Sequence, residues 1–364
     1  MAIIAFDSGE ATQYPDYANV NTGGAWQTVA NKPSAWQIIS NTALASLGIS
    51  TSGAFSGTTC IRLNASANTC AMRRNVNATT HAENYISFMV KLDGTLRSQD
   101  FFSLRTSAGD ICCRLNSNAS GDVLVYAGTT PTLKATIAAG LAPSTWYNIQ
   151  LHFKAGVGAL AVLEVSIAGA TPVDCSGTTM ADWYWLECGQ VTSATGCTMY
   201  FDCIAVYDTT GTENNSWPGA PKILTAQRPT SDDPDVSDWT RNTGSNDFDM
   251  IKENQPDLDA TYVYSNLTGD ESLYGFSGIS EPENTIIKAV CLTAIAKRAD
   301  AAFLTPLVFR TGHAMVELTS LKKAVGSDYM TPIEWILELD PITNEAWHQE
   351  DLNATEFGFK HTTS

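Results

Sequence analysis

Paired carboxylates near the C-terminus are the residues in this sequence whose spacing comes nearest to catalytic chemistry. Glu338 and Asp340 occupy alternate positions of a predicted strand, the arrangement used by glycosidases that retain configuration. The position where a third acid is needed holds Thr343, which cannot act as a general acid, and Pro341 interrupts the strand. We predict a strand end entering a turn here, with an unrecognised glycan hydrolase using Glu338 or Asp340 as the alternative.

Other motifs for catalysis are missing from the chain. The sequence contains no GxSxG, HExxH, Walker A or dinucleotide GxGxxG pattern in the required context. Its five histidines are scattered, and His152 lies on the polar side of an alternating strand. We therefore expect no catalytic residues, no cofactor and no metal site, and a protein that is not an enzyme.

An acidic stretch from Ser231 to Asp259 is the one segment that suggests a bound cation. Its carboxylates are of the kind that ligate calcium, but it lacks the DxDxDG loop with a closing Glu. We interpret it as a solvated acidic loop near a domain junction, and support for calcium is weak.

Nine cysteines occur in the chain, an odd number, and several lie in strand-like runs. The adjacent Cys112 and Cys113 would point to opposite faces of a strand, which does not suit a zinc site. We expect the cysteines to be mostly free and buried.

Aromatic side chains are the best candidates for binding. Trp183, Tyr184 and Trp185 follow one another, Trp217 lies in a turn-rich strip, and Trp239 follows that strip. Large amphipathic rings of this kind fill cores, act as hot spots at protein interfaces or stack on sugars. All three roles remain open from the sequence.

Charge and hydropathy limit the partners. The chain has 38 acidic and 21 basic residues, a net charge of -17, which repels phosphate backbones, so we expect no nucleic-acid partner. No stretch approaches the roughly 18–20 apolar residues that span a bilayer, and the N-terminus does not resemble a signal peptide. We expect a soluble protein made in the cytosol.

Alternating apolar and polar residues predict an all-β protein. In one run Ile149, Leu151 and Phe153 alternate with polar residues, and similar short runs recur between Gly, Ser, Asn and Pro clusters. A chain of 364 residues exceeds what one core usually supports, about 250–300 residues. We predict two β-sandwich (jelly-roll) domains in tandem: residues 1–208, a linker at 209–222, and a smaller domain at 223–364.

Two stretches resemble bacteriophage virion proteins. The strand TWYNIQLHFKAG and the later MYFDCIAVYDTTG resemble laminin-G-like, concanavalin-like jelly rolls. The segment that follows resembles the exit segment through which the chain of such virion proteins leaves the jelly roll and enters a second domain. Its matching residues are Asp208, Gly211, Asn214, Asn215, Trp217 and Gly219.

The C-terminal segment resembles a closing element of the same phage proteins. Its matching residues are Asp340, Pro341, Thr343, Trp347, Asn353, Glu356, Phe357 and Gly358, with Asn344 where the family often has Gly. The resemblance implies a scaffold and no shared catalytic set.

The resemblance and the missing motifs together suggest a non-enzymatic structural protein of a phage virion, assembled in the host cytoplasm. We favour a tail, collar or fibre-associated component that contacts other virion proteins and copies of itself. The alternatives are a capsid decoration protein, or a carbohydrate-binding module that mediates adhesion to a host-surface glycan.

Overall fold

The structure is a computed structural model of the 364-residue chain. It describes residues 3–7, 36–40, 45–50, 53–56, 60–65, 70–76, 83–94, 98–190, 198–210, 213–224, 228–252, 257, 259–298, 301–327 and 333–363. Strands are the main regular secondary structure of the described residues, so the predicted all-β class with β-sandwich domains is confirmed.

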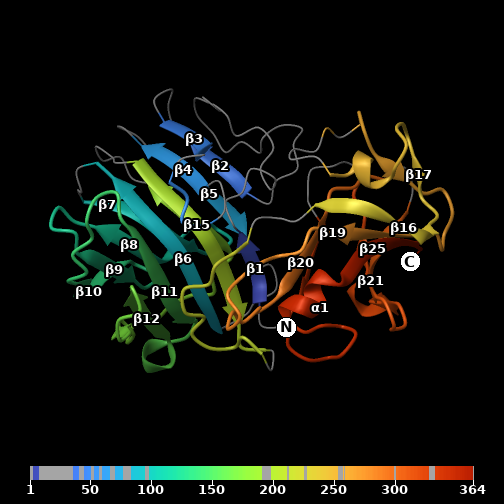
Figure 1. The fold of residues 1–364 in the computed structure, drawn as a ribbon. Coiled ribbons are helices and arrows are strands. Elements are labelled where there is room, and N and C mark those ends of the chain that lie inside the picture. Colours follow the sequence, from blue (N-terminus) through green and yellow to red (C-terminus); the bar gives the residue numbers. More distant parts are fainter. Residues whose placement is uncertain are drawn as a thin grey trace. The chain divides into compact units, whose positions relative to one another are not determined.

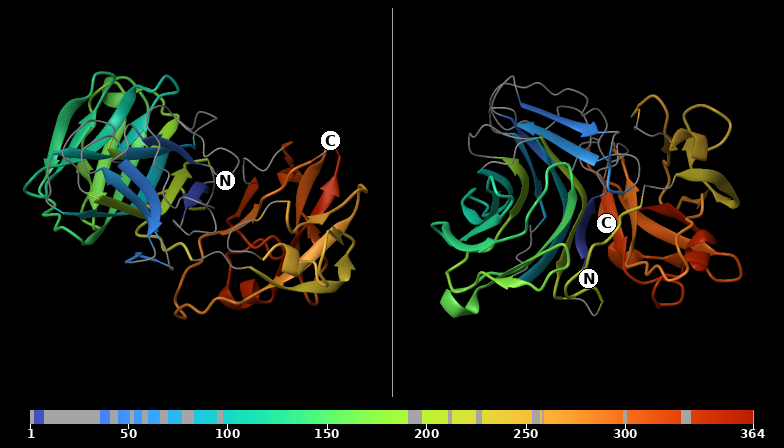
Figure 2. Two further views of the ribbon diagram at one scale, coloured as in Figure 1. Left: turned by 90° about the horizontal axis from the view of Figure 1, so that it is seen from above. Right: turned by 60° about the vertical axis from the view of Figure 1, so that its left-hand side comes forward.

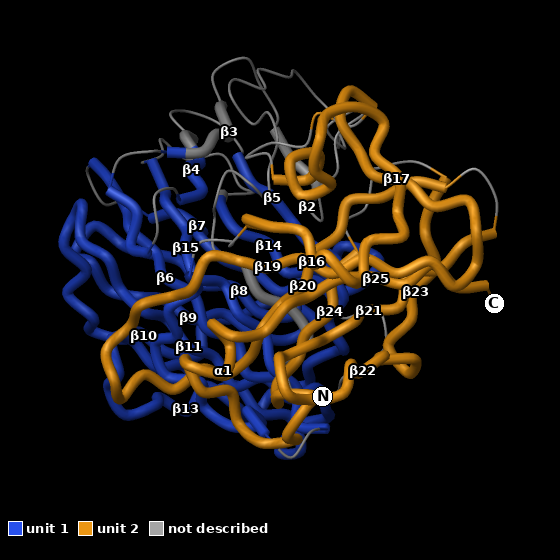
Figure 3. The backbone as a smooth tube through the Cα atoms, turned by 45° about the vertical axis from the view of Figure 1, so that its right-hand side comes forward, with its two compact units in different colours: residues 1–30, 35–225 blue, residues 31–34, 226–364 orange. Residues whose placement is uncertain are grey.

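The chain divides into two compact units, coloured separately in Figure 3. The first comprises residues 1–30 and 35–225, and the second residues 31–34 and 226–364. Residues 209–222, predicted as a linker, are grouped with the first unit. Each unit is described by itself below.

Two antiparallel sheets form the first unit as facing layers (Figures 1 and 2). The described strands of sheet A are, in order, β13 (Val173–Asp174), β12 (Val162–Ile167), β11 (Trp146–Lys154), β6 (Glu83–Asp93), β15 (Thr198–Asp208), β4 (Cys60–Ala65) and β3 (Ala45–Ser50), with β1 (Ile3–Asp7) also pairing with β15. Those of sheet B are β10 (Thr132–Ile137), β9 (Val123–Ala127), β8 (Ile111–Ser117), β7 (Gln99–Arg105), β14 (Trp185–Gln190), β5 (Cys70–Asn75) and β2 (Trp36–Ser40).

Period-two alternation builds the core between these sheets. Ile149, Leu151 and Phe153 of β11 are buried at 1% exposure or less, and the polar residues between them face outward from sheet A. Phe88 of β6 stacks on Phe102 of β7 with ring centroids 4.6 Å apart, which joins the two layers. Each fully buried phenylalanine contributes about 1.5–3 kcal/mol of transfer free energy.

The second unit contains a larger sheet and two small ones. The larger sheet, in order, is β16 (Pro229–Ser237), β19 (Glu271–Phe276), β25 (Thr355–Thr362), β21 (Phe303–Arg310) and β22 (Val316–Glu317), with β23 (Lys323–Ala324) also paired to β21. The small sheets are β17 (Thr240–Arg241) with β18 (Val263–Tyr264), and β20 (Val290–Ala294) with β24 (Ile333–Leu337).

The core of the second unit lies between the larger sheet and the β20–β24 pair. Trp335 of β24 is 1% exposed and meets Phe359 of β25 with ring centroids 5.1 Å apart. A short helix, α1 (Gln349–Asn353), precedes β25.

One prediction for the second unit is wrong. Residues 231–237, the first part of the acidic stretch interpreted as a solvated loop, belong to strand β16 (Pro229–Ser237). It pairs only with β19 among the described strands, so it lies at the sheet edge, where prolines and charged side chains are tolerated because one side of the backbone needs no partner.

Candidate functional site: an arginine–tryptophan face

The predicted binding aromatics do not form a single cluster. Trp183 is 2% exposed inside the first unit, where its Nε1 donates a hydrogen bond to Asn84 Oδ1 at 2.9 Å. In the second unit, Trp239 packs against the core, and its Nε1 donates to the Asp270 carbonyl at 3.2 Å. These two residues have structural positions, so neither ring is placed to stack on a ligand.

Tyr184 and Trp185 are the two predicted aromatics that the structure brings together at the surface. Their rings meet edge to face at 4.9 Å at the start of β14, and both are half-buried. Asn75 Nδ2 donates to the Tyr184 hydroxyl at 2.6 Å, and the Arg73 guanidinium lies 4.0 Å from the centre of the Trp185 ring. This cation–π contact fixes the arginine over one face of the indole.

Strand register extends this pair into a row across the outer face of sheet B. Arg73 of β5 lies opposite Glu187 of β14, Glu187 opposite Ser103 of β7, Ser103 opposite Arg114 of β8, and Arg114 opposite Tyr126 of β9. Side chains directly opposite on one face lie about 4.5–5.5 Å apart at Cβ. We call this row, with Arg105, Tyr184 and Trp185, the arginine–tryptophan face.

Glu187 lies at the centre of this face and is fully buried. Its Oε1 accepts hydrogen bonds from Ser103 Oγ at 3.0 Å and Arg105 Nε at 2.9 Å, and its Oε2 has no partner in the described structure. Burial raises the pKa of Glu187, against the opposing effect of Arg105, Ser103 and Arg73. The carboxylate therefore holds Arg105 and Ser103 in place from a fully buried position.

Arg114 is fixed in a similar way at the other end of the row. Its Nη1 lies 3.3 Å from Asp100 Oδ2, and its guanidinium lies 4.3 Å from the centre of the Tyr126 ring. Its side chain remains 25% exposed, and that of Arg105 13%. Both arginines are thus oriented in advance while part of each reaches solvent.

None of these arginines was singled out from the sequence. The signal was present as an arginine at an outward position in the strand sequences CAMRRN, QDFFSLR and ICCRLNS. Only strand order and register show that the three lie on one face.

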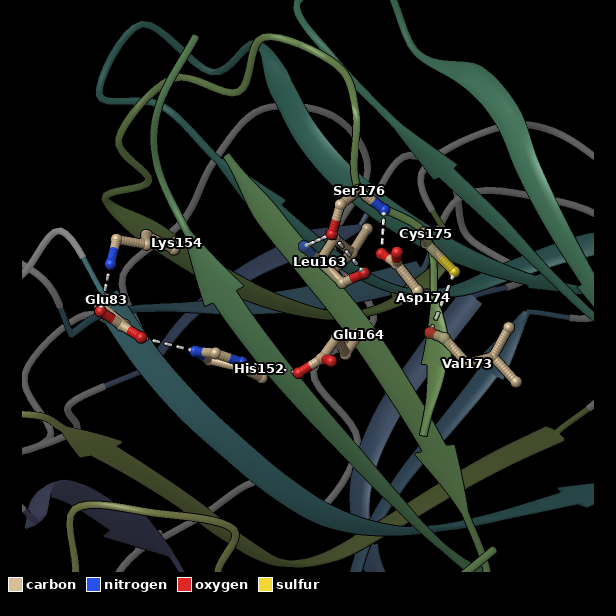
Figure 4. A network of polar contacts seen from close by, with 9 residues as sticks. All are labelled: Glu83, His152, Lys154, Leu163, Glu164, Val173, Asp174, Cys175 and Ser176. Carbon is tan, nitrogen blue, oxygen red and sulfur yellow. Dashed lines mark hydrogen bonds and ion pairs between the residues drawn. The ribbon is translucent and has the colours of Figure 1, made fainter. Parts of the chain in front are cut away.

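Trp217 belongs to a second polar network, on the outer face of sheet A. His152 lies between Glu83 and Glu164, with ring nitrogens 2.8 Å from each carboxylate, and Lys154 pairs with Glu83 at 2.8 Å (Figure 4). Tyr85 stacks on His152 at 4.3 Å, and Trp217 meets both rings edge-on. Burial by itself would raise the pKa of Glu83. The hydrogen bonds and charges of Lys154 and His152 outweigh this effect, so the pKa of Glu83 is lowered.

This second network anchors the exit segment, residues 213–224, on sheet A. Ser87 Oγ donates to the Gly219 carbonyl at 3.0 Å, and the Gly219 amide donates to Gln150 Oε1 at 3.0 Å. Ser87 is 0% and Gln150 5% exposed. The buried side chains of Ser87 and Gln150 therefore find their hydrogen-bond partners in the exit segment, and we interpret this network as structural.

Residues of the closing element are also structural. Asp340 is 1% exposed, forms a 2.5 Å ion pair with Arg310 and accepts the Ile342 amide at 2.9 Å. Trp347 is 3% exposed and donates from Nε1 to the Leu337 carbonyl at 3.0 Å. Asp340, enclosed in this way, is not placed to attack or protonate a glycan, whereas Glu338, the other acid of that alternative, is half-buried.

Cysteine, histidine and acidic side chains are the potential metal ligands of this chain. The eight cysteines within the described residues are free, seven of them buried, as predicted; Cys197 lies outside the described residues. In the part of the chain that the structure describes, no group of three or more His, Cys, Asp or Glu side chains is arranged to hold a metal ion. No helix there is long and apolar enough to cross a membrane.

Two acids in the second unit, Glu356 and Asp233, lie close enough to shift each other's pKa. Glu356 of β25 and Asp233 of β16 hydrogen bond to each other, and burial, followed by this bond and the Asp233 charge, raises the pKa of Glu356 to about 7. Because the folded-state pKa exceeds the unfolded value, the stability it provides is complete below about pH 4.5 and is lost as the pH rises through 7.

Replacing Glu356 with glutamine is expected to remove this pH dependence. An amide donates to Asp233 at every pH, so Glu356→Gln will unfold at a higher temperature than the wild type at pH 8 and at nearly the same temperature at pH 5. Thermal unfolding at both values measures the difference. Exposed Glu350 supplies the control, Glu350→Gln, which should follow the wild type; an equal response to pH in Glu356→Gln would show that the pair is not proton-linked.

No protein-family model matches the chain, and no curated protein sequence matches it. Solved structures do match, over about half of it. They include an endo-β-1,4-glucuronan lyase from Trichoderma reesei (TM-score 0.37, 13% identity, 56% of this chain and 95% of that one). An alginate lyase from Chlorella virus (0.36, 8%, 45% and 90%) and a carbohydrate esterase from Shiga toxin-encoding bacteriophage phi24B (0.36, 14%, 50% and 91%) also match.

All three neighbours are named as enzymes that act on carbohydrates. They contradict the expectation, drawn from missing motifs, that this chain is not an enzyme. At this degree of likeness no reaction, substrate or residue role passes from them to this chain. What the chain shares with these structures is the jelly-roll β-sandwich.

Proposed function

We propose that the protein binds a glycan through the arginine–tryptophan face of its first unit. The observation that carries this proposal is the half-buried Tyr184–Trp185 pair on an outer sheet face, next to the fixed guanidinium of Arg73. An indole offers a flat apolar surface to the C–H face of a sugar, and nearby guanidinium and amide groups, such as that of Asn75, hydrogen bond to its hydroxyls. A few oriented polar groups around aromatic rings give such a site its specificity.

Trp185→Ala tests this function directly. A central tryptophan in a binding surface typically contributes 2 kcal/mol or more, so we expect affinity to fall by about 30-fold or more. Binding is measured by calorimetry with oligosaccharides selected on a glycan array that includes host-surface polysaccharides.

Trp146→Ala is the matched control for that experiment. Trp146 begins β11 on the outer face of the other sheet, and its Nε1 donates to the Gly53 carbonyl at 3.0 Å. The control variant should bind as tightly as the wild type. A folded Trp185→Ala protein with unchanged affinity would exclude this site.

A second candidate function is a structural role in a phage virion. It is supported by the residues that carry the resemblance: Asp340 and Trp347 form a buried turn, and Gly219 fixes the exit segment, which suits a scaffold. In this proposal the protein is assembled into particles in the host cytoplasm, as a tail, collar or fibre-associated component or a capsid decoration protein, and contacts other virion proteins and its own copies.

Cryo-electron microscopy of intact particles tests the virion proposal. Density for two β-sandwich units on the tail or collar would fit a glycan-binding attachment role, and density on the head would fit decoration. Particles without such density would exclude it. Glycan binding by the isolated protein is a separate result and could stand without the virion role.

A further inference from the structure

We propose that the glycan bound by the arginine–tryptophan face is acidic, a chain whose sugars carry carboxylates; this rests on the proposed function. The basis is the alignment of Arg73, Arg105 and Arg114 on one outer face of sheet B, beside Trp185 and Tyr126. A guanidinium presents two parallel N–H groups that match a carboxylate, and it does so with more specificity than a lysine.

The three arginines are held in place before any ligand arrives. Arg73 lies over Trp185, Arg105 donates from Nε to Glu187 and from Nη1 to the Gly109 carbonyl at 2.9 Å, and Arg114 lies over Tyr126. Long side chains that are already ordered lose little conformational entropy on binding. Such ordering on an outer face is a property of a recognition surface.

Charge on this face departs from that of the whole chain. The protein carries a net charge of -17, yet three of its 21 basic residues lie on this face, where Glu187 pairs with Arg105 and Asp100 with Arg114. Guanidinium groups attract a carboxylate at short range, where the net charge of the protein, spread over its whole surface and screened by salt, has less effect.

Spacing favours a chain of sugars over a single one. Arg73 and Arg114 lie on β5 and β8, with β14 and β7 between them. Three strand spacings correspond to about 14 Å across the sheet. A ligand that reaches both must repeat its anionic group along its length, as a polyuronate does, and the aromatic rings at Trp185 and Tyr126 lie beside the same path.

Matched pairs of oligosaccharides test the charge requirement. Each acidic chain, such as oligogalacturonate, oligomannuronate or a hyaluronan oligomer, is compared with its carboxyl-reduced form, which keeps the sugar backbone and loses the charge. We expect at least one acidic form to bind and its reduced form to bind at least tenfold more weakly, with affinity for the acidic form decreasing as salt is added.

Variants separate this inference from the proposed function. Arg114→Gln should lower affinity for the acidic form by about tenfold and leave affinity for the reduced form unchanged, since it removes one charged hydrogen-bonding group. Trp185→Ala should lower both. Lys154→Gln, with the same charge change on the outer face of sheet A, should change neither; Arg73→Gln replaces Arg114→Gln if the latter does not fold.

Each other outcome contradicts the inference in a distinct way. Equal binding of acidic and reduced forms would exclude the charge requirement and leave glycan binding standing. If dextran sulfate binds as tightly as the acidic oligosaccharides, the face attracts any polyanion and does not recognise carboxylates. Binding of none of the chains, acidic or neutral, would exclude both the inference and the function on which it rests.

Discussion

Trp183→Ala is expected to lower the free energy of unfolding of the first unit by about 3–5 kcal/mol, the usual cost of removing a large buried aromatic side chain. Trp183 is 2% exposed and belongs to the core between the sheets. Its removal leaves a cavity and deprives the fully buried Asn84 Oδ1 of the indole N–H at 2.9 Å. Urea-induced unfolding measures the loss, and hydrogen exchange of the β6 and β14 amides localises it.

Trp185→Ala provides the comparison two residues away. The Trp185 ring is half-buried on the outer face, so its removal creates no internal cavity, and we expect a stability change below about 1 kcal/mol. The two variants should therefore affect different properties: Trp183→Ala lowers stability, and Trp185→Ala lowers glycan affinity. A Trp183→Ala protein as stable as the wild type would contradict its assignment to the core.

The second large effect is expected for Asp340→Ala, which should destabilise the second unit by about 3–5 kcal/mol. The change leaves Arg310, 5% exposed, without its buried counter-charge. It also removes the acceptor for the Ile342 amide in the turn. Hydrogen exchange in β21 and β25, which are paired through Arg310 and Thr355, should increase most.

Asp351→Ala is the matched control, because Asp351 pairs with the same arginine at 2.7 Å but is 37% exposed. Solvent screens this pair, so the loss should stay below about 1 kcal/mol. Replacing both partners, as Arg310→Met with Asp340→Leu, should recover part of the loss because no unpaired charge remains buried. Equal effects of Asp340→Ala and Asp351→Ala would contradict the importance of burial.

Fold class could be predicted from the sequence because β-strand alternation is a local property. Ile149, Leu151 and Phe153 must face one side of a strand whatever the partner strand is, and burial of that side determines a sandwich. Prediction failed for β16, since its prolines and acids are typical of a loop. A strand tolerates these residues at the edge of a sheet, and whether β16 lies at an edge depends on the order of the strands.

The candidate site shows the same division. Alternation taken alone places Trp183 and Trp185 on one side, but the regular strand begins only at Trp185, and the preceding backbone turns Trp183 into the core. The sequence by itself determined which aromatic residues could bind, including Tyr184 and Trp185, but it did not single out the arginines beside them. Only the tertiary structure brought Arg73, Glu187 and Arg114 into one row, because they come from β5, β14 and β8, and long-range strand pairing, unlike alternation, is not encoded in any single segment.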